Sequence, residues 1–265
     1  MPTRFGPAGL GGVKEAVSNL REYARLGLRA CKIAFTYGVY IKEKQKKEIK
    51  AIKETAEKND IRLSIHAPYW INLNSKEKKK IEESKKRILE CCKIGNFLKA
   101  YCVVFHPGYY GGMKEEETYR NIKKEILDMQ KEIKKNKYNI SLAPETTGKI
   151  NVFGKEEEIL GLVEETGCSF CIDFAHLLAR SQGKRSYKEM YNKIKKFKKL
   201  HCHFSGIEWT EKGERRHKIT PEKEIKKLLA VLPKNKDIVI INESPAPVDD
   251  SVKSLRIWNK IGKTG

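Results

Sequence analysis

Six short apolar runs of this sequence end in histidines or acidic residues. They lie at 64–69, 104–108, 142–145, 171–176, 201–205 and 240–244. All six histidines fall at such an end or in the loop just after it, and none lies in a lysine-rich helical stretch. Imidazole and carboxylate are the usual ligands of zinc and its first-row neighbours. If these ends converge in space, the sequence predicts a site for several metal ions.

Acidic side chains are part of the same pattern. Glu145, Asp173 and Glu243 lie at predicted strand ends, and Glu214 lies in a basic loop. These carboxylates and the imidazoles offer more ligands than one tetrahedral ion needs, which predicts two or three ions. The share of histidine favours Zn²⁺, with Mn²⁺ as the alternative, over Mg²⁺. His201 and His203 share one face of a strand, so either is the candidate ligand and the other supports it.

Apolar, strand-like runs alternate with amphipathic helical stretches along the whole chain. The predicted strands are 3–5, 30–35, 62–65, 101–105, 139–142, 169–172, 200–204 and 238–241. Short, continuous apolar strands are typical of a parallel sheet that helices cover. Eight such repeats with no break in composition predict one α/β domain over residues 1–265, a (β/α)8 TIM barrel. A doubly wound open sheet is the alternative fold, although no Gly-x-Gly-x-x-Gly motif supports it.

The elements that flank the candidate site are also predicted. In a barrel all strands end on one face, so residues 66, 106, 145, 173, 203 and 243 are expected to ring one pocket. Ser75 and Thr220 are expected to be the N-caps of the helices that follow them. The segment 205–219 is expected to be a loop that carries several basic residues.

The net charge points to an anionic partner. The 265 residues include 55 Lys and Arg against 34 Asp and Glu, a formal charge of +21. Such an excess favours binding to nucleic acid, because neutralising phosphates releases counterions. A heat-adapted surface rich in Lys and Glu is the alternative, but such a surface would nearly balance its charges.

The cysteines and the hydropathy indicate the compartment. Seven cysteines lie mostly in apolar runs, as reduced buried thiols of a cytosolic protein do. Cys168 and Cys171 form a C-x-x-C pattern within a predicted strand, where they point to opposite faces, so they are interpreted as core residues. No leader-like or membrane-spanning run occurs. We therefore expect a soluble, cytoplasmic monomer with no membrane partner.

Several of these motifs together resemble the endonuclease IV family of apurinic/apyrimidinic endonucleases. They are 66–69 with 71–73, 105–108, Glu145, 171–176 and Glu243, and the resemblance covers the chain from the first predicted strand to the eighth. The resemblance implies a xylose-isomerase-like barrel with three zinc ions. It also implies DNA repair by hydrolysis of the phosphodiester 5′ to an abasic site in double-stranded DNA, which leaves a 3′-hydroxyl and a 5′-deoxyribose phosphate.

The resemblance also implies a role for each ligand. His66, His106 and Glu145 would hold one ion, and the catalytic Glu145 would bridge to a second ion. The second ion would be completed by Asp173, His203 and Glu243. A third ion would be held by His176 and His217. The family has an Asp two residues before this last histidine, whereas Arg215 stands here, so Glu214 is the candidate substitute.

Residues that contact DNA are expected at the mouth of the barrel. Tyr69 and Asn72 follow the first histidine motif, and Tyr69 matches a family residue that wedges into DNA. The family's arginine wedge after the second strand is absent here, and Tyr37 or Tyr40 is near its place. The candidate phosphate contacts are Arg180, Lys184, Arg185, Lys212 and Arg216.

Two other functions fit the same fold. A metal-dependent sugar isomerase or epimerase would use Glu145, Asp173, His203 and Glu243 around one or two ions. It would leave four histidines and the charge of +21 unexplained. A basic nucleic-acid-binding barrel whose ions are only structural is the other alternative.

Overall fold

The strands at the centre of the molecule form two parallel sheets. The computed structural model describes residues 3–35 and 46–261. One sheet has the order β1–β10–β7–β6 and the other β2–β3–β4–β5. Their bounds are β1 Arg4–Pro7, β2 Ala30–Ala34, β3 Arg62–His66, β4 Cys102–Phe105, β5 Ser141–Pro144, β6 Ile172–Asp173, β7 Lys199–Phe204 and β10 Asp237–Asn242.

Two parallel bridges join the sheets into a ring. Ala8 pairs with Lys32 between β1 and β2, and Glu145 pairs with Cys171 between β5 and β6. Every neighbouring pair of strands in the ring is parallel. The predicted (β/α)8 barrel is therefore confirmed. Closing the ring brings the carboxyl ends of all eight strands to one face.

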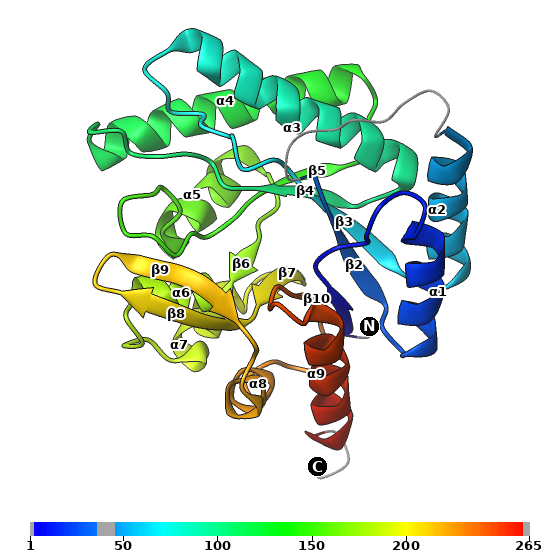
Figure 1. The fold of residues 1–265 in the computed structure, drawn as a ribbon. Helices are drawn as coiled ribbons and strands as arrows, with labels where there is room; N and C mark the ends of the chain where they lie inside the picture. Colours follow the sequence, from blue (N-terminus) through cyan, green and yellow to red (C-terminus); the bar gives the residue numbers. More distant parts are fainter. Residues whose placement is uncertain (1–2, 36–45, 262–265) are drawn as a thin grey trace.

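Helices surround this ring (Figure 1). They are α1 Ala16–Arg25, α2 Lys46–Lys58, α3 Lys78–Leu98, α4 Glu115–Lys135, α5 Glu156–Thr166, α6 Phe174–Arg180, α7 Tyr187–Ile194, α8 Glu222–Leu229 and α9 Pro247–Ile261. Their apolar stripes, such as Ile122, Ile126 and Met129 of α4, are buried in the main core. Among the described residues, no helix has the length and apolarity needed to cross a bilayer.

The alternation of side chains along the strands separates two apolar layers. In β4, Val103 and Phe105 belong to the core between barrel and helices, whereas Cys102 and Val104 pack inside the barrel. Because strand side chains alternate with period two, one strand contributes to both layers. The inner layer is narrow, and small residues such as Ala143 occupy it.

The segment after β7 is not the predicted loop. Residues 206–218 form an antiparallel hairpin of β8 Gly206–Thr210 and β9 Gly213–Lys218, with an irregularity at Glu208 and Trp209. The hairpin lies beside α6 (Figure 1). The prediction was wrong because the β9 stretch is charged, and charged strands carry no apolar pattern by which to recognise them.

The two predicted N-caps were also wrong. Glu77 precedes α3, while the Ser75 hydroxyl accepts a hydrogen bond from the Glu77 amide ahead of the helix. Pro221 precedes α8, and the Thr220 hydroxyl instead accepts hydrogen bonds from Gly206 and Asn242. Thr220 therefore ties the hairpin to the end of β10 rather than capping a helix.

The closure between β1 and β2 depends on a glycine. A Cβ added at Gly6 would lie 1.7 Å from the carbonyl oxygen of Ala30. We expect Gly6→Ala to lower the free energy of unfolding by about 3 kcal/mol, because the clash is between two main-chain segments and neither can move aside. Chemical denaturation measures this. Gly12→Ala is the control, because the nearest atom there is the end of the flexible Glu15 side chain. Equal stability of the two variants would contradict the prediction.

Candidate metal centre

The predicted ligands converge at the carboxyl ends of the strands. His66 ends β3 and Asp173 ends β6, while His106, Glu145 and Glu243 directly follow β4, β5 and β10. His203 lies in β7, one residue before its end. The barrel therefore brings together the residues that the sequence analysis placed at strand ends.

The Glu145 carboxylate lies at the centre of the group and is fully buried. One of its oxygens lies 3.0 Å from Nε2 of His66 and 3.1 Å from Nε2 of His106. The other lies 2.6 Å from Nδ1 of His203. One carboxylate thus contacts imidazoles from three strand ends, the arrangement expected of a ligand that bridges two ions.

A second group shares Glu145 with the first and contains His203. Nδ1 of His203 lies 3.1 Å from the Glu243 carboxylate, and Asp173 belongs to the same group. The Lys32 ammonium, from β2, forms an ion pair with Glu243. Lys32 is 6% exposed, so this positive charge is held inside the barrel mouth.

The third group joins α6 to the hairpin. Nε2 of His176 lies 3.2 Å from Nε2 of His217, and the Glu214 carboxylate lies 3.4 Å from the former and 3.7 Å from the latter. Nδ1 of His217 lies 2.6 Å from the Ser205 hydroxyl. Glu214 therefore lies beside both histidines, and its role as a metal ligand stays a prediction.

The donor set of these three groups fits metal ions. The ligand atoms within each group lie within 4.8 Å of one another: His66, His106 and Glu145; Glu145, Asp173, His203 and Glu243; Asp173, His176 and His217. Glu145 and Asp173 are each shared by two groups. One Asp173 oxygen accepts from the His176 amide, but the other is buried without a hydrogen-bond partner among the described residues. An unpaired buried carboxylate oxygen is costly unless a cation lies beside it.

Burial and charge set the protonation of these groups. Burial lowers the pKa of His203 to about 3, so its imidazole is neutral, as a metal ligand must be. Burial would raise the pKa of Glu145, but its contacts with His203 and the other two imidazoles hold it well below its usual range. Burial opposes protonation of His176, yet the surrounding carboxylates, led by Asp173, raise its pKa to about 9. The site therefore concentrates negative charge, which favours cations.

Members of all three groups, His66, His106, His176, His217 and Glu243, line one cavity of about 120 Å³. Its walls include Tyr69, which is 67% exposed at the mouth, and the neighbouring Trp70 is 66% exposed. The sequence analysis did not identify Lys32, Trp70 or Ser205. Lys32 lies in a strand interior, where only its charge among apolar neighbours could have indicated that it faces a polar site.

The candidate DNA contacts differ in their surroundings. The Arg180 guanidinium donates to carbonyl groups of Lys149, Ile150 and Val152 and so holds that loop. Arg185 pairs with Glu156, and Arg216 with Glu208.

The remaining candidates lie at or near the surface. Lys184 and Lys212 are exposed. Asn72 accepts hydrogen bonds from the amides of Asn74 and Tyr109, which orders its own loop. Tyr37 and Tyr40 lie outside the described residues. Contact with DNA stays a prediction for all of these residues.

This chain is similar in sequence to an uncharacterized protein and, over part of its length, to a probable endonuclease. The chain is 37% identical to an uncharacterized protein of Methanocaldococcus jannaschii over 97% of both chains. It is 30% identical to a probable endonuclease 4 of Aquifex aeolicus over 44% of this chain and 43% of that protein.

Solved structures with the same fold belong to both candidate classes. SacUVDE superposes with a TM-score of 0.76 at 16% identity, covering 95% of this chain and 88% of that one. Endonuclease IV from Thermus thermophilus superposes with 0.71 at 18% identity over the full length of both chains. A D-tagatose 3-epimerase-like protein superposes with 0.68 at 18% identity over 98% of both. At these identities the likeness concerns the fold. The family model of the xylose isomerase-like TIM barrel matches residues 20–261, and this chain belongs to that family.

Proposed function

We propose that this protein is a DNA-repair endonuclease that hydrolyses the phosphodiester 5′ to an abasic site, with a cluster of two or three zinc ions. The observation that carries the proposal is the position of four histidines. His66, His106, His176 and His217 all line one cavity, and each belongs to a ligand group that contains Glu145 or Asp173. With these histidines, the ligands form three adjoining groups instead of one.

A sugar isomerase or epimerase accounts for only part of this site. Its ligands would be Glu145, Asp173, His203 and Glu243 around one or two ions. The four further histidines would then have no role, although two of them contact Glu145 directly. The partial match to a probable endonuclease 4 also favours the nuclease.

The cavity suits a substrate that enters it only in part. A volume of about 120 Å³ is small beside the clefts of roughly 300–1,000 Å³ that enclose drug-sized ligands. A polymer that presents one phosphate and one extruded deoxyribose would leave its remainder outside. Tyr69, which lines the cavity and is mostly exposed, and the next residue, Trp70, also mostly exposed, would offer aromatic faces where a base has been lost.

The chain's own residues supply carboxylates, imidazoles and the Lys32 amine paired with Glu243. Zinc ions, when bound, would neutralise the phosphate charge, lower the pKa of a water molecule and stabilise the leaving oxygen. Glu145 would position two of the ligand groups relative to each other, since both of its oxygens contact imidazoles. The excess of 21 positive charges would attract DNA to the mouth.

Replacing Glu145 tests the centre of the site. We expect Glu145→Gln to slow the nicking of a duplex with one abasic analogue by more than about a hundredfold, beyond the loss typical of residues that only support ligands. Glu125→Gln is the control, because Glu125 is 5% exposed but pairs with Lys85 between α3 and α4. Near-normal nicking by Glu145→Gln would refute the assignment.

Metal removal separates the candidate functions. We expect two to three zinc ions per chain at the cavity groups and loss of nicking on chelation, with recovery when Zn²⁺ is returned. Chelation should also lower Tm by roughly 5 °C or more, because ions that bind only the folded state stabilise it. One Mn²⁺ per chain with epimerase activity on a ketose would favour the alternative. Activity that persists without metal would contradict both.

Lys32 is expected to weaken metal binding at the carboxylate of Glu243, with which it pairs. Because its ammonium pairs with Glu243, we expect Lys32→Met to raise zinc affinity about tenfold, equivalent to about 1.4 kcal/mol. Competition with a chromophoric chelator measures this. Lys85→Met, which removes a lysine paired on the outer helices, should leave the affinity unchanged. Unchanged affinity in Lys32→Met would show that the ammonium does not compete.

A further inference from the structure

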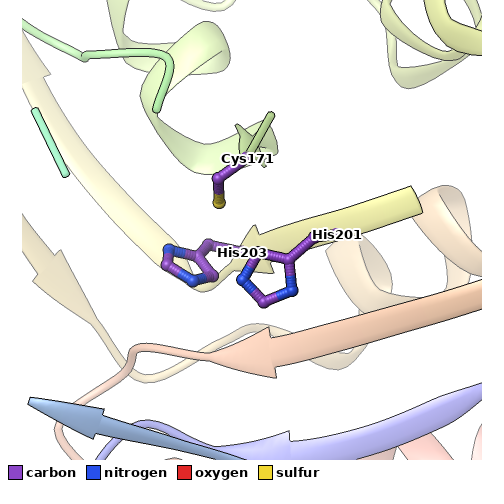
Figure 2. A group of neighbouring side chains, drawn as sticks. All are labelled: Cys171, His201 and His203. Atoms are coloured by element: carbon purple, nitrogen blue, oxygen red, sulfur yellow. The ribbon is translucent and has the colours of Figure 1, made fainter. Parts of the chain in front are cut away.

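A second set of ligand-type side chains lies inside the barrel, beneath the cavity. Cys171, directly before β6, faces His201 and His203 of β7 (Figure 2). One ligand atom from each lies within 4.8 Å of the others. Cys171 and His203 are fully buried, and His201 is 3% exposed.

The register of the strands explains this meeting. Ile172 pairs with Cys202 and Asp173 with His203, so Cys171 lies next to His201 in the same register. Side chains alternate along a strand, so 171, 201 and 203 point into the barrel. Cys202 points the other way and is buried in the core beneath the helices.

Each histidine uses one ring nitrogen and leaves the other unpaired. Nδ1 of His203 contacts Glu145, and Nδ1 of His201 contacts the Tyr101 hydroxyl. Nε2 of each ring is buried with no hydrogen-bond partner among the described residues. Leaving a buried polar nitrogen unpaired costs about 1–3 kcal/mol. Two such atoms on rings with centroids 5.1 Å apart, beside a thiol, indicate a missing ligand.

The chemistry of the set selects a cation. Two imidazole nitrogens and a sulfur suit a borderline or soft transition ion such as Zn²⁺, whereas the carboxylate-rich cavity above also suits harder ions. The Tyr101 hydroxyl can accept from Nδ1–H of His201, which leaves a lone pair on Nε2. Such a contact on the second nitrogen is how ligand histidines are commonly oriented.

We propose that Cys171, His201 and His203 form an interior N₂S site for a zinc-like ion, which shares only His203 with the cavity groups. On binding, the Cys171 thiol releases its proton to solvent and its sulfur donates an electron pair to the ion. His203 links the two levels: its Nε2 lone pair goes to the interior ion while Nδ1–H faces Glu145, and Nδ1 can bind a cavity ion as well only if that proton is also released to solvent, which makes the ring an imidazolate. The C-x-x-C pattern thus contributes one ligand, Cys171, and its partners are the two histidines rather than Cys168.

Cobalt substitution of the full-length protein tests the site. Metal-free protein is loaded with Co²⁺, which gives a near-ultraviolet sulfur-to-cobalt charge-transfer band only where a thiolate is a ligand. The cavity groups contain no sulfur, so the band reports the interior site alone. We expect the wild type to show the band. The Cys171→Ser variant should lose the band and bind one equivalent of cobalt less. The visible bands of the cavity ions should remain in this variant.

Cys202→Ser is the matched control, since Cys202 is an equally buried thiol on β7 that faces the helices, and it should keep the band. If Cys171→Ser does not fold, His201→Gln tests the site without touching the thiol and should remove the same equivalent. A wild type that binds cobalt without the band, as when only water fills the space, overturns the proposal, as does a band that persists in Cys171→Ser. Nicking of abasic DNA is scored separately, so either proposal can fail while the other stands.

Discussion

The burial of the Glu145 carboxylate is the constraint on which the rest of this site depends. A negative charge with no exposure to water is stable only if positive or hydrogen-bonding groups surround it. Imidazoles from three strands meet it. These strands must therefore end at the same height along the barrel axis, as neighbouring strands of a parallel barrel do. The closure of the barrel is therefore also what assembles the site around this carboxylate.

Different kinds of side chain lie at successive levels along the barrel axis. The mouth carries exposed aromatics, and the cavity beneath it carries carboxylates, imidazoles and the Lys32 ammonium. Under the cavity lie two unpaired imidazole nitrogens and a thiol. His203 belongs to both lower levels.

Much of the fold followed from local patterns. Apolar runs of strand length, separated by amphipathic helices, indicated the barrel, because side-chain period is a property of a few consecutive residues. His66, His106, Glu145 and Asp173 were recognised for the same reason, since each directly ends a run. His203 was preferred over His201, and it is the one in contact with both Glu145 and Glu243. The hairpin 206–218 escaped prediction, because its strand β9 is charged and carries no apolar alternation by which to recognise it.

The sequence by itself determined which residue types stand at the strand ends, and hence the barrel and the character of its mouth. The tertiary structure alone decided which of these residues meet. The Lys32–Glu243 pair joins residues 211 positions apart, and the turn of the hairpin carries Glu214 to His176. The interior pairing of Cys171 with His201 depends on the register between β6 and β7. Such contacts arise from ring closure and register, which sum interactions over the whole chain, and no local pattern of residues encodes them.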